Sequence, residues 1–171
     1  MGTNNRNKGE SKTRIGNRYV MKTKQELKAY KSEIESECGR CTILNVIKSN
    51  NKKNCNNTDD RKAAKGWSWI DYWRAMTGKS ETQLSCASCG KIIYVGPIPK
   101  MMERMYALTG DKPENHVAHG GHVWVNTPKS GKYKGGIYIV PLCPYCNGQH
   151  GKNIIIKEGS VLCKELCAEK S

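Results

Sequence analysis

Hydrophobic residues in the first part of the chain recur at helical spacing. Residues 23–37 form such a pattern, in which the apolar positions share one face: Leu27, Tyr30 and Ile34. Thr23 and Glu26 supply a capping box at the start of this segment. The sequence therefore predicts an amphipathic helix that ends near Cys38.

A second helix is expected over residues 67–76, which contain three tryptophans: Trp67, Trp69 and Trp73. Gly78 follows the last apolar position and predicts the end of the helix. Large aromatic side chains dominate the energetics of small cores, so we expect these rings to be buried. The alternative is an exposed platform on which nucleic-acid bases stack.

Beyond the second helix the pattern alternates between strands and one further helix. Residues 92–95, 123–125 and 137–140 are short apolar runs that predict strands. Pro99 can start a helix that stops at Gly110. Its stripe of long apolar side chains is expected to fill gaps in the core: Met101, Met102, Met105 and Leu108. The Asn- and Lys-rich residues 48–63 predict a loop.

Composition limits how such elements can be stabilised. The chain has 171 residues, of which 37% are hydrophobic and none is Phe, so apolar burial alone gives a thin core. Nine cysteines are the expected compensation. The sequence has no apolar run of about 18 residues and no apolar signal segment at its start, which predicts a cytoplasmic protein with reduced thiols and no membrane partner.

Positive charge is concentrated in two regions of a chain whose net charge is +14. Residues 1–31 carry nine basic side chains against two acidic ones, and we expect residues 1–22 to be a disordered basic arm. No Asp or Glu occurs from 115 to 157. Four lysines there are the candidate phosphate ligands: Lys129, Lys132, Lys134 and Lys152. These features favour a nucleic-acid partner, DNA or RNA, over a basic surface that only confers solubility.

Two Cys-x-x-Cys pairs carry the strongest chemical signal. Cys86 and Cys89 precede a glycine, as in a zinc knuckle, and Cys143 and Cys146 follow a predicted strand. Four thiolates match the closed tetrahedral geometry of structural Zn²⁺. The alternatives are disulfides and free buried thiols. We predict one structural zinc ion at these four residues.

The remaining cysteines give a weaker pattern. Cys38 and Cys41 form another Cys-x-x-Cys pair, and Cys163 and Cys167 are spaced as on a terminal helix. They are candidates for a second metal site, with Cys55 as a substitute ligand.

The order of three segments resembles the treble-clef HNH endonuclease family. CASCGK is followed by HVAHGGHVWV and then by YIVPLCPYCNGQHGK, all within residues 84–157. The resemblance implies an α+β fold, a zinc-binding treble-clef ββα core with short flanking helices and the basic arm. Together with the charge and the helical pattern, it predicts three parts: the arm (1–22), a helical and loop segment (23–83) and an HNH-like domain (84–171). The Asn- and Lys-rich composition suggests a phage or bacterial source.

The resemblance also implies catalytic roles for residues at the matching positions. His122 corresponds to the general base that deprotonates water. Asn147 corresponds to a ligand of a second divalent metal near His122, and His150 to a residue that contacts phosphate. The sequence departs from the family at Gly121, where many members place a metal ligand, and lacks the middle Asn. Without a local carboxylate, His119 would favour a softer metal such as Zn²⁺ or Ni²⁺.

Each of these residues also has a structural interpretation. His122 can be a buried hairpin residue, and Asn147 can be a helix N-cap. Three histidines at three-residue spacing are further candidate zinc ligands: His116, His119 and His122.

Two function classes follow. The first is a zinc-stabilised, HNH-like nucleic-acid-binding protein with weak or unusual metal-dependent nuclease activity. The second is a non-catalytic interaction module, a small regulator or inhibitor that presents the same scaffold to a protein or ribonucleoprotein.

Overall fold

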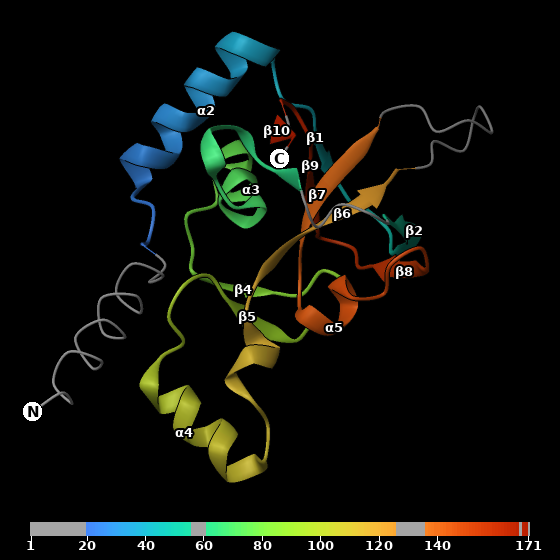
Figure 1. The fold of residues 1–171 in the computed structure, drawn as a ribbon. Helices are drawn as coiled ribbons and strands as arrows, with labels where there is room; N and C mark the ends of the chain where they lie inside the picture. Colours follow the sequence, from blue (N-terminus) through green and yellow to red (C-terminus); the bar gives the residue numbers. More distant parts are fainter. Residues whose placement is uncertain (1–19, 56–60, 126–135, 168, 171) are drawn as a thin grey trace, which may run out of the picture.

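The computed structural model describes residues 20–55, 61–125, 136–167 and 169–170. It is a mixed α/β structure in which a curled antiparallel sheet is covered on one side by helices (Figure 1). Most of the predicted basic arm and three of the candidate phosphate ligands lie outside the described residues: Lys129, Lys132 and Lys134. Within the described residues, no helix combines the length and apolar character needed to cross a membrane.

Two helices form the layer that packs against the sheet. Helix α2 (Lys24–Cys38) begins where the capping pattern predicts, because the Thr23 hydroxyl accepts a hydrogen bond from the Glu26 backbone N–H at 3.1 Å. Its buried side chains are the predicted ones: Leu27, Tyr30 and Ile34. Helix α3 (Trp69–Thr77) contacts α2 on one side and the sheet on the other (Figure 1). Both predicted helices are confirmed.

The tryptophans stabilise this layer. Trp69 and Trp73 of α3 are buried, and Trp73 donates its indole N–H to the Val161 carbonyl at 2.8 Å. Trp67 stacks on Tyr30 with 3.8 Å between ring centroids. The expectation that these rings belong to the core is therefore confirmed for Trp69 and Trp73.

The six-stranded sheet combines two strands from the first third of the chain with four strands from its last third. Its order is β1 (Ile43–Asn45), β9 (Val161–Lys164), β7 (Ile137–Leu142), β6 (His119–Trp124), β2 (Asn50–Asn54) and β8 (Asn153–Ile156). Every neighbouring pair is antiparallel. Strands β1 and β2 precede residue 83, whereas β6 to β9 follow it. The segments 23–83 and 84–171 thus build one sheet together.

Smaller elements surround this sheet. A separate hairpin pairs β4 (Gln83–Ser85) with β5 (Ile92–Tyr94), and β3 (Arg61–Lys62) pairs with β10 (Glu169–Lys170). Single turns of 3-10 helix lie at η1 (Ala64–Gly66) and η2 (Pro113–His116). Helix α4 (Lys100–Thr109) projects at the end of the molecule away from α2, and α5 (Pro144–Asn147) follows β7 (Figure 1).

Two sequence predictions of element type are wrong. The predicted loop over residues 48–63 contains β2, because the polar Asn50–Asn54 segment is paired on both sides, by β6 and β8. Pairing with two neighbours outweighs the low strand propensity of Asn and Lys. Cys163 lies in strand β9 rather than on a terminal helix.

The predicted burial of the methionine stripe on α4 is also wrong. Met101, Met105 and Leu108 are 73%, 50% and 87% exposed, and Tyr106 is the buried residue of this helix. Tyr106 stacks on His116 with 3.9 Å between ring centroids. The helix therefore packs through Tyr106, and three of the four long apolar side chains of its stripe are exposed.

Candidate metal centre

The first half of the centre is the tight turn between β4 and β5. The Cys86 backbone N–H donates to the Lys91 carbonyl at 2.8 Å, and the Gly90 N–H donates to the Cys86 carbonyl at 2.9 Å. Gly90 has φ +80°, a conformation that disfavours residues with a Cβ. This turn places the Cys86 and Cys89 thiols on the same side.

The second half is the junction between β7 and α5. Cys143 is the N-cap residue of α5, and its Sγ accepts a hydrogen bond from the Cys146 N–H at 3.4 Å. Pro144 occupies the first turn, where its missing N–H costs nothing. A helix of four residues is short, and Asn54 supports it by donating from its side-chain amide to the Cys146 and Asn147 carbonyls, both at 3.1 Å.

Asn54 is a supporting residue that sequence reasoning missed. It is 1% exposed, and it lies in the segment whose composition predicted a loop. One Asn among many in that segment carries no signal of its own.

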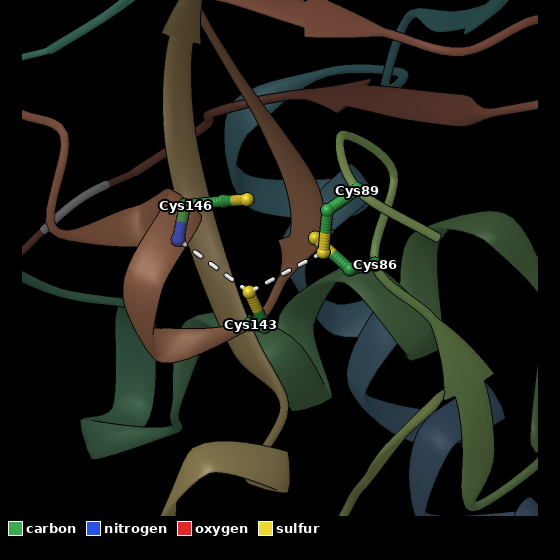
Figure 2. Close-up of side chains that lie close together, drawn as sticks. All are labelled: Cys86, Cys89, Cys143 and Cys146. Carbon is green, nitrogen blue, oxygen red and sulfur yellow. Dashed lines mark hydrogen bonds between the residues drawn. The ribbon is translucent and has the colours of Figure 1, made fainter. Parts of the chain in front are cut away.

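The four thiols converge on one point (Figure 2). All four sulfur atoms lie within 4.8 Å of one another, and the sulfurs of Cys89 and Cys143 are 3.7 Å apart. Tetrahedral Zn²⁺ with Zn–S bonds of about 2.3 Å requires sulfur separations of about 3.8 Å. Cys86, Cys143 and Cys146 are buried, whereas Cys89 is exposed. This donor set fits a closed structural zinc ion.

Backbone hydrogen bonds fix the two halves relative to each other. The Ala87 N–H donates to the Pro141 carbonyl of β7 at 2.9 Å, and the Lys157 N–H donates to the Ala87 carbonyl at 2.8 Å. The turn that carries Cys86 and Cys89 is thereby held between β7 and the end of β8. The positions of the thiols do not depend on side-chain packing alone.

The electrostatics of the cluster favour a bound cation. Burial raises the pKa of Cys143 and of Cys146, and the nearby Cys86 adds to both shifts. Burial also acts to raise the pKa of Cys86, but hydrogen bonds from the backbone, first from Cys143, outweigh it and lower that pKa. Four thiolates at these separations repel one another, so a divalent cation is what allows all of them to deprotonate.

His122 lies on the opposite side of the sheet from this centre. A Cβ added to Gly120 would meet Trp69 of α3, whereas one added to Gly121 would approach the Asn147 side-chain oxygen of α5 at 3.1 Å. Side chains alternate along a strand, so His122 faces α3 together with Gly120. Its ring packs edge-on against Trp69, with centroids 4.8 Å apart.

The surroundings of His122 are those of a core residue. It is 5% exposed, and its Nε2 lies 3.5 Å from Oε2 of Glu165, whose side chain is 6% exposed. Its backbone carbonyl accepts from the Cys55 N–H at 2.9 Å. The structure thus does not bring His122 together with Asn147, and its contact with Glu165 could not be predicted from the sequence.

The other predicted site residues are more accessible. His119 lies on the α5 face of β6, the same face as Gly121; its side chain reaches the surface, and partial burial of the ring lowers its pKa. Asn147 is half-buried at the end of α5. His150 is exposed, and its Nδ1 lies 3.2 Å from the Cys55 carbonyl. Lys152 is exposed in the turn before β8.

The three histidines proposed as alternative zinc ligands are separated from one another. The two ring nitrogens of His116 contact the Ile92 carbonyl at 2.9 Å and Asp111 Oδ2 at 2.7 Å. His116 and His122 therefore pack against different elements, and only His119 is exposed.

Replacement of His122 by alanine is expected to lower the free energy of unfolding by about 1–3 kcal/mol, because it removes packing against Trp69 and the contact with the buried Glu165 carboxylate. His119→Ala, on the same strand but exposed, is the matched control and should change stability by less than about 0.5 kcal/mol. Urea denaturation of both variants measures the difference. Equal effects of the two substitutions would contradict the placement of His122 in the core.

The chain matches no protein-family model, no curated protein and no solved structure. The four cysteines of the centre are arranged so that they can bind a metal ion such as zinc.

Proposed function

We propose that the chain is a zinc-stabilised nucleic-acid-binding protein built on an HNH-like treble clef. The order of elements supports the scaffold: a cysteine turn, the β6–β7 hairpin, and a short helix that begins at the second cysteine pair. Zinc, when bound by the four thiolates, supplies a cross-link between the turn and the helix.

The observation that carries the proposal is the distribution of charge over the sheet. None of its six strands contains Asp or Glu, whereas four carboxylates lie on α2: Glu26, Glu33, Glu35 and Glu37. Lys53 of β2 and Lys152 before β8 are exposed, and they are neighbours because the Asn54 N–H donates to the Lys152 carbonyl at 2.8 Å. A surface with lysines and no carboxylates attracts a phosphate backbone.

The test is charge reversal at this edge. The double variant Lys53→Glu, Lys152→Glu is expected to weaken binding to a mixed-sequence DNA duplex at least about tenfold and to reduce the salt slope by about two. The matched control is Lys100→Glu, Lys112→Glu, which changes net charge equally but lies around α4, where both lysines are exposed. Fluorescence anisotropy across a salt series measures both quantities.

Three outcomes separate the function classes. Loss of affinity in the first variant alone supports the proposal. Equal loss in both variants indicates attraction by net charge without a defined surface. If the unmodified protein shows no salt-dependent binding to DNA or RNA, the interaction module with a protein or ribonucleoprotein partner replaces this proposal.

Hydrolysis through His122 is not part of the proposed function. A general base must reach water and the scissile phosphate, and His122 is enclosed by Trp69 and Glu165. The face that carries His119, Asn147 and His150 is the one on which a phosphodiester could bind. Any cleavage should therefore survive in a folded His122 variant and be lost in His119→Ala.

A further inference from the structure

The ends of α2 and β9 lie side by side, although they are far apart in the sequence. Strands β1 and β9 are antiparallel, with Ile43 opposite Cys163. The pairing continues beyond β1, because the Lys164 N–H donates to the Thr42 carbonyl at 2.9 Å. Residues 38–41 therefore run alongside residues 163–167.

This pairing brings four cysteines onto two adjacent segments of the chain. Cys38 and Cys167 form a disulfide with their Cα atoms 6.1 Å apart. Cys41 and Cys163 are both buried, and they lie on neighbouring segments, because Cys163 is opposite Ile43, two residues after Cys41. The Cys41 sulfur also lies 3.3 Å from the Lys164 carbonyl oxygen, which places it against the segment that leads to Cys167.

We propose that Cys38, Cys41, Cys163 and Cys167 form a second four-thiolate Zn²⁺ site, of which the disulfide-bonded arrangement is the oxidised, metal-free form. The proposal does not depend on nucleic-acid binding. It assigns one shared role to four cysteines that the first centre leaves unused.

The local backbone supports a metal site at this place. Gly39, inside the Cys-Gly-Arg-Cys turn, has φ +88°, so the turn is tight enough to direct two thiols toward one ion. Cys167 has φ +49°, a conformation that is uncommon for a residue with a Cβ. As in the first centre, some of the cysteines are buried and one, here Cys167, is exposed.

Conversion between the two forms is a balanced reaction. A phosphine reductant breaks the Cys38–Cys167 bond, each sulfur gains one electron and one proton, and the phosphine becomes its oxide with oxygen from water. Zn²⁺ then binds four sulfurs and displaces the thiol protons. In the opposite direction, a small-molecule disulfide oxidises Cys38 and Cys167 by thiol–disulfide exchange and is itself reduced to two thiols, and the ion is released as two of its ligands are lost.

The experiment counts zinc in the full chain by native mass spectrometry. Protein reduced with a phosphine and supplied with Zn²⁺ is expected to hold two ions, and the disulfide form one. Cys41→Ser should reduce the count in the reduced protein from two to one. Cys55→Ser is the matched control, because Cys55 is buried outside both clusters, and it should leave two ions.

The zinc counts distinguish an error about the second site from an error about the first. A reduced wild-type protein that holds one zinc, lost in Cys143→Ser but kept in Cys41→Ser, overturns the second site and retains the first. Two ions that persist in Cys41→Ser also overturn it. Because the wild-type protein alone gives a decisive count, poor folding of a variant does not leave the proposal open.

Discussion

Removal of zinc from the Cys86, Cys89, Cys143 and Cys146 centre is expected to lower the free energy of unfolding by at least about 4 kcal/mol. Structural zinc supplies about 10–16 kcal/mol in zinc-finger peptides, and part of that energy is lost when the ligands fall apart. The elements that the ion connects are small, since β4 and β5 share three residue pairs and α5 has four residues. They have little apolar surface of their own to keep them together.

Cys143→Ser is the sharpest form of this experiment. A serine hydroxyl is a good N-cap, so it can still accept the hydrogen bond that the Cys143 sulfur accepts from the Cys146 N–H, while it removes one metal ligand. We expect the loss of one zinc per chain and a large fall in Tm. Cys55→Ser, at a buried cysteine outside the centre, should keep all the zinc and most of the stability. A metal-stripped protein with unchanged Tm would show that the ion is not structural.

Gly120→Ala is expected to cost about 3 kcal/mol, because a Cβ there has no room. It would overlap the Trp69 backbone, lie 2.6 Å from the Trp69 Cβ and lie 2.7 Å from the Ile70 nitrogen. The obstruction is the backbone of α3, which cannot rotate away as the end of a side chain can. The substitution must separate α3 from β6, the contact that also encloses His122.

Two other glycines make matched comparisons for Gly120. At Gly121 the added Cβ would meet the Leu142 side chain, with its Cγ at 2.9 Å, so Gly121→Ala should cost less than Gly120→Ala. At Gly148, φ is −72° and the nearest atom is 3.2 Å away, so Gly148→Ala should change stability by about 0.5 kcal/mol or less. Urea midpoints that do not follow this order would contradict the close contact between α3 and β6.

The same geometry bears on the acidic residue that the HNH resemblance finds missing before His122. An aspartate at position 121 would be forced into Leu142 and Asn147, so Gly121→Asp is expected to disrupt the β6–α5 contact rather than to complete a metal site. Close packing against Leu142 and Asn147 explains why position 121 is a glycine.

Local features of the molecule could be predicted from the sequence. Neighbouring residues determine the helix caps at Thr23 and Gly78, and both caps are present in the structure. Short spacing also determines the two Cys-x-x-Cys pairs of the metal centre, which the structure brings together. What the sequence could not predict depends on distant partners. Strand β2 is a strand because β6 and β8 flank it, and no property of Asn50–Asn54 indicates this.

The sequence also does not predict which neighbouring element each side chain faces. A strand pattern says that His122 and Gly121 face opposite ways, but it does not say which face α3 covers. The α4 stripe of Met101, Met105 and Leu108 has the spacing of a core helix, yet the chain provides little to cover it. Periodicity identifies an apolar face without identifying its partner.

The order of strands in the sheet has a consequence for synthesis of the protein. Within the six-stranded sheet, β6 and β7 are the one pair of neighbours that are also consecutive along the chain, and Ile43 pairs with Cys163, 120 residues later. During translation β1 and β2 emerge early but have no strand to pair with until the later strands have left the ribosome. Because distant pairings must overcome the entropy of closing long loops, we expect the nascent chain to expose unpaired strand edges until late in synthesis and to fold slowly once complete.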